Sequence, residues 1–85
     1  MLKVWTDIMW DEYQEWLSDN TKKVSKINAL INSIEREGVM KGLGKPEPLK
    51  YRKGFSRRID NENRLIYDVE NGKLNLISRA STSTA

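Results

Sequence analysis

The period of apolar and polar positions changes along the chain and marks its elements. Residues 2–5 alternate between polar and apolar types, which predicts a short strand. Either Thr6 or Asp7 can cap a helix that begins after them. Apolar residues then recur at steps of three and four, as on one face of a helix, at Trp10, Tyr13, Trp16 and Leu17. Such an aromatic stripe is typical of a core, with stacking on nucleic-acid bases as the alternative.

A second helix is predicted from about residue 21 to residue 37, after a short break that suggests an antiparallel helical hairpin. Its apolar stripe consists of Val24, Ile27, Leu30, Ile31 and Ile34. Gly38 follows at the position where a helix C-terminus favours glycine. Near the start of this helix, Lys22, Lys23 and Lys26 oppose the helix dipole, so they either face a partner or are simply solvated.

From residue 49 the pattern becomes that of strands, which we predict over residues 55–59, 64–69 and 73–78. The pair at residues 71–72, Asn-Gly, is a strong signal for a two-residue hairpin. In that register the residues that face the helices are Leu65, Tyr67, Val69, Leu74, Leu76 and Ser78. Arg64 then lies on the other face, opposite Arg79. In the preceding hairpin, a symmetric loop would put Arg58 on the face opposite to Arg64, whereas a bulge would put both on the same face. The spacing of residues leaves both possibilities open.

These elements predict an α+β fold in the order β-α-α-β-β-β, with two antiparallel helices on a mainly antiparallel sheet. A chain of 85 residues allows one domain with a modest core. We expect the domain to span residues 1–78. Residues 79–85, which are mostly small and hydroxyl-bearing, are expected to form a frayed tail.

A linker over residues 39–48 contains two glycines and two prolines. Pro46 and Pro48 disfavour helical backbone at the residues that precede them, so Glu47 is carried on a stiff, extended segment. Little backbone entropy is lost when such a carboxylate is held in place. The segment suits a catalytic carboxylate and suits equally the entry to an edge strand.

Charge is distributed unevenly along the chain. Residues 41–67 carry eight Lys or Arg against three acids, a net +5, whereas the remainder carries seven basic and nine acidic residues, a net −2. A basic surface on an otherwise acidic domain is typical of a protein that binds phosphate groups, such as those of RNA. The alternative is an ordinary solvated face.

Composition excludes several classes of site. The chain has no cysteine and therefore no disulfide or thiolate metal site, and it has no histidine, the commonest acid–base catalyst and zinc ligand. We expect no metal and no cofactor. No apolar run is long enough to cross a bilayer, so we expect a cytoplasmic protein without a membrane partner.

Three motifs now stand in order: GKPEPLK at residues 44–50, SRRI at 56–59 and ENRLIY at 62–67. Together they closely resemble the YoeB group of bacterial toxins in the RelE-like superfamily, and the resemblance spans roughly residues 1–78. It implies the RelE-like, microbial-ribonuclease-like fold and a metal-independent endoribonuclease that cuts mRNA in the decoding site of the 70S ribosome. It also implies neutralisation by a YefM-type antitoxin and, in many members, a homodimer.

The resemblance assigns roles to individual residues. Glu47 matches the general base of the family and Arg64 its phosphate-stabilising arginine. Lys50 and Arg58 match positions that contact or neutralise the scissile phosphate. We also expect Arg57 and Lys45 on the RNA-binding surface, because they lie in the same basic motifs.

The C-terminus departs from the family pattern. Members normally end in a sequence of the type Cys-Lys/Arg-x-His-Tyr, in which the histidine is the general acid, and no histidine exists here to replace it. Loss of a general acid typically costs about 10²–10⁴ in rate. An altered or detoxified end is one explanation. The stretch between Lys50 and Ser56 is also about two residues shorter than usual, which could misplace Arg58 relative to Glu47.

We therefore expect a toxin-family ribonuclease of reduced activity. The alternative is a catalytically inactive variant that keeps the ribosome- or antitoxin-binding surface. A small DNA-binding regulator is disfavoured, because neither predicted helix presents basic residues along one face as a recognition helix does.

Overall fold

The structure is a computed structural model and describes residues 1–81. Its elements follow the predicted order, with one additional two-residue strand ahead of the main hairpins. In chain order they are β1 (Leu2–Trp5), α1 (Asp7–Asp19), α2 (Thr21–Glu37), β2 (Glu47–Pro48), β3 (Phe55–Arg58), β4 (Asn63–Glu70) and β5 (Lys73–Ser81).

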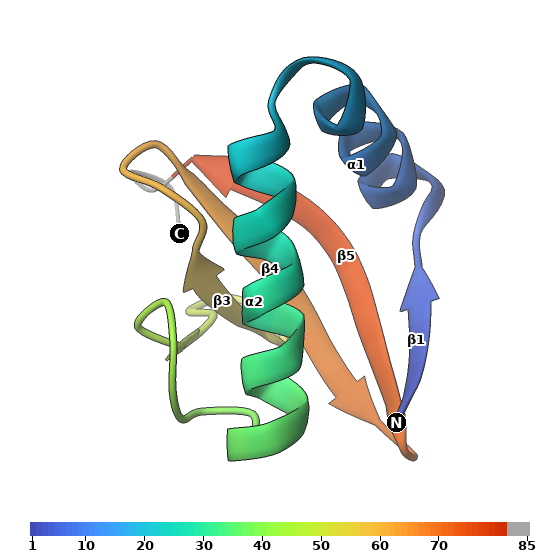
Figure 1. The fold of residues 1–85 in the computed structure, drawn as a ribbon. Helices are drawn as coiled ribbons and strands as arrows, with labels where there is room; N and C mark the ends of the chain where they lie inside the picture. The colour runs from blue at the N-terminus through green and yellow to red at the C-terminus, as the bar shows by residue number, and fades with distance from the viewer. Residues whose placement is uncertain (82–85) are drawn as a thin grey trace.

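The strands form one five-stranded sheet in the order β1-β5-β4-β3-β2. β1 runs parallel to β5, and the other neighbouring strands are antiparallel. Both helices lie against the same face of this sheet, with α2 running along it (Figure 1). The predicted α+β class is confirmed. Within residues 1–81, neither helix combines the length and hydrophobicity needed to span a bilayer.

The two helices are closed by the capping residues that the sequence provides. The Thr6 hydroxyl accepts a hydrogen bond from the Met9 amide at 3.1 Å and begins α1. Asn20 ends α1, because its amide donates to the Trp16 carbonyl, and its side chain caps the start of α2. A single residue thus joins the helices, which fixes the tight turn between them.

The core lies between the helices and the sheet. The predicted stripe of α2 is confirmed, since all five of its apolar residues are buried. In α1 the prediction is only partly right: Trp16 is buried, but Trp10 is 46% and Leu17 44% exposed. Met9 takes the interior position instead. Trp10 packs on Trp5 at the surface, with 5.6 Å between ring centroids.

A β-bulge in β5 corrects the predicted register of the last hairpin. The hairpin begins as expected, with Glu70 opposite Lys73 around the two-residue turn, but the register shifts between Ile66 and Tyr67. Beyond the shift, Arg64 pairs with Ala80 rather than with Arg79. β5 extends to Ser81, so the expectation that residues 79–81 begin a frayed tail is wrong. Residues 82–85, the rest of that tail, lie outside the described residues.

Candidate active site

The strand β2 brings Glu47 beside Arg64. Glu47 pairs with Ser56 of β3, and one of its carboxylate oxygens, Oε2, lies 3.7 Å from Nη2 of Arg64 in β4. The Glu47 side chain is 59% exposed, whereas that of Arg64 is 3% exposed. The carboxylate is therefore accessible to a ligand, and the guanidinium beneath it is fixed in the protein.

Arg64 is held by hydrogen bonds to the neighbouring strand β3 and to the linker. Its Nε donates to the Ser56 hydroxyl at 2.9 Å, and its Nη2 donates to the Lys45 carbonyl at 2.9 Å. Lys45 adopts a left-handed backbone conformation with φ of 51°, which is uncommon for a residue other than glycine. Backbone strain of this kind is concentrated at functional sites, where surrounding structure enforces it.

Arg58 lies on the same face as Arg64, which resolves the question that spacing left open. The two arginines are direct cross-strand partners, because Asn63 already belongs to β4 and its carbonyl accepts from the Ile59 amide at 2.9 Å. The register therefore differs by one residue from that of a symmetric turn in which Ile59 would pair with Arg64. The Nε of Arg58 is buried and has no hydrogen-bond partner within residues 1–81. Buried donors without a partner are uncommon in native structures.

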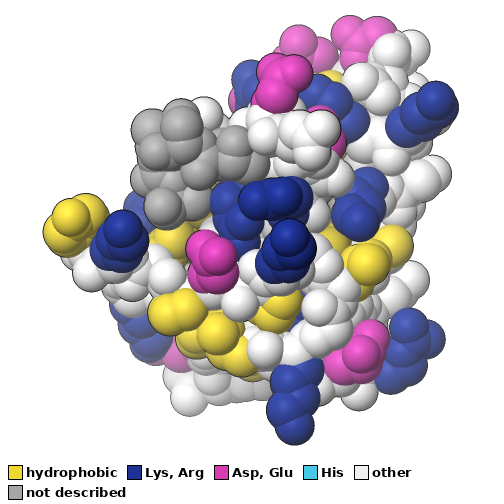
Figure 2. All heavy atoms as spheres, turned by 90° about the vertical axis from the view of Figure 1, so that its left-hand side faces the viewer, with side chains coloured by type: hydrophobic (Ala, Val, Ile, Leu, Met, Phe, Trp, Pro, Cys, Tyr) yellow, Lys and Arg dark blue, Asp and Glu magenta, His cyan; other side chains and the backbone are white. Residues whose placement is uncertain are grey.

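A shallow pocket of ≈ 280 Å³ opens beside Arg58. Its lining includes Lys26 of α2 together with Gly44 and Lys45 of the linker. A second pocket, lined by Lys22, Lys23 and Lys26, shares Ile59 and Asp60 with the first. The lysines at the start of α2 thus continue the basic surface away from Glu47. Figure 2 shows Lys and Arg side chains gathered on the face that the linker and β3 present.

Lys50 lies in the loop that joins β2 to β3. This loop is closed by a hydrogen bond from the Leu49 amide to the Gly54 carbonyl at 3.0 Å. Lys50 is exposed, and within the described residues no hydrogen bond or ion pair ties it to Glu47, Arg58 or Arg64. It therefore stands at the rim of the site rather than in its centre.

The prediction that Arg57 contacts RNA is wrong. Its side chain is 0% exposed, and its strand position pairs with Leu65 on the face that the helices cover. Adjacent strand residues point to opposite faces, so Arg57 and Arg58 cannot both line one surface. Arg57 instead binds polar groups in the interior, among them the hydroxyl of Tyr67 at 2.9 Å.

Two groups beside the site have shifted pKa values. Burial raises the pKa of the Tyr67 hydroxyl, and the hydrogen bond and charge of Arg57 together with the charge of Arg64 offset only part of that effect. For Asp60, burial also acts to raise the pKa, but hydrogen bonds from Glu62 and Asn63 and the charge of Lys23 outweigh it, so the pKa is lowered. Tyr67 therefore stays protonated and Asp60 stays ionised near neutral pH.

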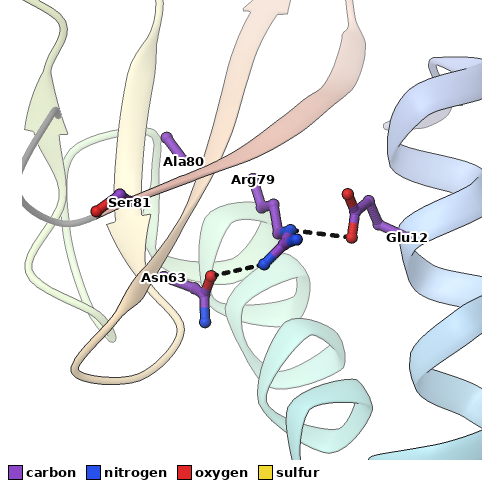
Figure 3. Close-up of a pocket in the computed structure, with 5 residues that line it drawn as sticks. All are labelled: Glu12, Asn63, Arg79, Ala80 and Ser81. Atoms are coloured by element: carbon purple, nitrogen blue, oxygen red, sulfur yellow. Dashed lines mark hydrogen bonds and ion pairs between the residues drawn. The ribbon is translucent and has the colours of Figure 1, made fainter.

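Arg79 lies on the helix side of the sheet, away from Arg64. Its Nε contacts a Glu12 carboxylate oxygen at 2.9 Å, and its Nη1 donates to the Asn63 side chain at 3.1 Å. Figure 3 shows Arg79 between these two groups, at a pocket of ≈ 430 Å³ that Ala80 and Ser81 also line. The two contacts join the end of β5 to α1 and to the first residue of β4.

Comparison with known proteins identifies the family of the chain. A profile of the family described as YoeB-like toxin of bacterial type II toxin–antitoxin system matches residues 5–81. The chain belongs to the YoeB-like toxin family. Toxin YoeB of Escherichia coli K12 is 43% identical over 76 residues, which cover 87% of this chain and 89% of that relative. Toxin YoeB of Synechocystis is 43% identical over 76 residues, which cover 86% of each chain.

Solved YoeB structures share the fold. The YoeB dimer from Staphylococcus aureus is 35% identical, covers 92% of both chains and superposes with a TM-score of 0.87. A chain of the YoeB-YefM complex from the same organism is 36% identical, and the match covers 93% of this chain and 94% of that chain. Its TM-score is also 0.87. The YoeB/ParE toxin from Agrobacterium tumefaciens is 39% identical with a TM-score of 0.85.

Sequence reasoning missed two parts of this YoeB-type site. Ser56, which accepts from Arg64, could have been found from strand alternation, since it shares the face of Arg58. The carbonyl of Lys45 could not, because no side-chain pattern signals which backbone oxygen an arginine binds.

Proposed function

We propose that this YoeB-family toxin is a ribosome-dependent, metal-independent endoribonuclease that cleaves mRNA in the ribosomal A site and so arrests translation. The observation that carries the proposal is the exposed carboxylate of Glu47 held 3.7 Å from the buried guanidinium of Arg64. An accessible base beside a fixed cation is what cleavage of an RNA phosphodiester without a metal requires.

Glu47 is the general base. The ribose 2′-oxygen attacks the adjacent phosphorus as its proton passes to the Glu47 carboxylate, and the bond from phosphorus to the 5′-oxygen breaks. The products are a 2′,3′-cyclic phosphate and a 5′-hydroxyl, which takes up one proton. Pairing of Glu47 with Ser56 holds the carboxylate in a defined place, which favours this proton transfer.

Arg64 and Arg58 stabilise the negative charge that builds up on the phosphorane. Both come from paired positions of β3 and β4, so their guanidinium groups act on one side of the sheet. Arg58 lines the pocket beside the site and carries a positive charge for a phosphate oxygen, and Lys45 on the same pocket adds a second. Lys50 at the rim neutralises a phosphate nearer the edge of the site.

Turnover is slow because the chain has no histidine to protonate the leaving oxygen. Arg79 cannot serve, since arginine stays protonated at any physiological pH and this residue is engaged with Glu12. Cleavage is then expected to fall below that of a toxin with a general acid by about 10²–10⁴.

The partners that we propose are a YefM-type antitoxin, the 70S ribosome with its mRNA, and a second copy of the chain. The Staphylococcus aureus YoeB-YefM complex and YoeB dimer support the first and the last. Exposed apolar side chains on β1 and α1 supply contact area for either, and they include Leu2, Ile8, Trp10 and Leu17. The cytoplasm, where ribosomes translate, is the proposed location.

The absence of histidine favours a second candidate, an inactive variant of the same fold that still binds ribosome or antitoxin. Primer extension on translating ribosomes separates the two candidates. The chain is compared with a variant whose tail is rebuilt to end in His-Tyr. We expect weak A-site cuts from the parent chain and strong cuts from the rebuilt one. Salt-sensitive co-sedimentation with intact mRNA from the parent would support the binder, and no cutting by either form would contradict the ribonuclease.

A further inference from the structure

The guanidinium of Arg57 is fully buried and surrounded by oxygen atoms. Its Nη2 donates to the carbonyls of Gly38 at 2.8 Å and Lys41 at 2.7 Å, and lies 3.3 Å from that of Val39. Its Nη1 donates to the Leu43 carbonyl at 2.8 Å. Within residues 1–81 no carboxylate forms an ion pair with it. Its contacts are therefore directed at the linker backbone.

Those carbonyls belong to the segment that leads directly to Glu47. Residues 38–43 turn around the guanidinium, and the next residue, Gly44, accepts a hydrogen bond from the Arg58 amide. A Cβ built on Gly44 would stand 3.2 Å from Cβ of Arg57 and 2.6 Å from Leu30, so the linker passes very close to β3. Lys45 and Pro46 alone then separate this fixed segment from β2.

Two hydroxyl groups extend the network to other elements. Ser33 of α2 accepts from Nη1 of Arg57 at 3.1 Å and from the Leu43 amide at 3.0 Å. Tyr67 of β4 accepts from Nε of Arg57 and donates to the Val39 carbonyl at 2.6 Å. The linker is thereby tied to α2, β3 and β4 by three side chains, and Arg57 makes most of the bonds to the linker carbonyls.

We infer that Arg57 is a positioning residue, which sets the place of Glu47 relative to Arg64 by holding the linker from inside. The effect on catalysis rests on the proposed function. That Arg57 holds the linker follows from the hydrogen bonds alone. A planar fork with five N–H donors can satisfy carbonyls that lie around it in several directions. An ammonium group has three donors at one point, so lysine keeps the charge and loses most of these bonds.

The first test is hydrogen exchange on the full chain carrying Arg57→Lys, with Arg36→Lys on the exposed end of α2 as the matched control. Amides of residues 38–47, apart from Pro46, are expected to exchange faster by roughly tenfold or more, while those of β4 and β5 keep most of their protection. Should Arg57→Lys not fold, Tyr67→Phe serves, since it removes only the hydroxyl that joins Arg57 to Val39. Unchanged exchange in the linker overturns the inference. The exchange experiment gives this answer even if the parent chain cuts no mRNA.

The second test is a double-mutant cycle in single-turnover mRNA cleavage on ribosomes. Arg57→Lys alone is expected to slow cleavage by about 10²-fold with little change in ribosome binding. In a Glu47→Gln background it should slow cleavage no further, because its effect passes through that carboxylate. An equal loss in both backgrounds, or a parental rate despite a loosened linker, overturns the inference. Absence of cleavage by the parent chain counts against the proposed function alone.

Discussion

The Glu47 carboxylate lies 3.7 Å from the Arg64 guanidinium, although their strands β2 and β4 are not neighbours in the sheet. The guanidinium reaches across β3, where the Ser56 hydroxyl and carbonyl accept its hydrogen bonds. Ser56 also pairs with Glu47 in the sheet register. One short strand therefore sets the positions of both groups, and the geometry of the site depends on β3.

Replacing Arg64 tests whether a fixed fork of donors is needed. Arg64→Lys keeps a positive charge but cannot bond Ser56 and the Lys45 carbonyl together, so we expect cleavage to fall by about 10²–10³. Single-turnover primer extension at saturating toxin measures the rate, and thermal unfolding confirms that the variant is folded. A folded Arg64→Lys protein that cuts at the parental rate would remove Arg64 from the proposed mechanism.

Arg58 is expected to contribute one phosphate contact. Arg58→Met should weaken ribosome binding and reduce the slope of log affinity against log salt by about one unit, as loss of one phosphate contact does. Arg36→Met, an exposed arginine on α2, removes the same charge elsewhere and should leave the slope unchanged. Sedimentation with ribosomes over a series of salt concentrations gives both slopes. Equal slopes for the parent and Arg58→Met would show that Arg58 contacts no phosphate.

Asp60 predicts a pH dependence of stability. Its folded-state pKa lies below the ordinary value of 3.8, so ionised Asp60 stabilises the fold above that value, and the contribution is lost as pH falls through the folded pKa. Asp60→Asn should therefore be less stable than the parent at neutral pH, and the difference should shrink below about pH 4. Urea unfolding at a series of pH values measures it. A difference that stays constant down to acid pH would contradict the assigned contacts with Glu62, Asn63 and Lys23.

The helical elements were predictable because burial follows a simple period. In α2 the apolar stripe accounts for every buried residue except Ser33, and Asn20 and Gly38 mark its ends. In α1 the aromatic stripe misled, since Trp10 packs against Trp5 at the surface and Met9, a residue outside the predicted stripe, fills the core. Aromatic side chains can bury much of their surface against one another while they stay at the protein surface. Their spacing alone therefore does not define the interior face of a helix.

The faces of the arginines were less predictable. Arg57 and Arg58 carry the same charge but lie on opposite faces of the sheet. Which of them shares the face of Arg64 depends on the pairing register of β3 with β4, and a slip of one residue would exchange them. The bulge that turns Arg79 toward Glu12 likewise has no signal in composition. The extended backbone at Glu47 was predictable from its flanking prolines, whereas the interior support from Arg57 emerges only once the linker is folded.

The measurement that tests the central claim most directly is primer extension on translating ribosomes with Glu47→Gln. The matched control is Glu15→Gln, an exposed acid on α1 outside the site. We expect the parent and the control to cut mRNA in the A site alike, and Glu47→Gln to lose cleavage by about 10²–10⁴ with unchanged ribosome binding. Cleavage by Glu47→Gln at the parental rate would contradict the assignment of this carboxylate as the base.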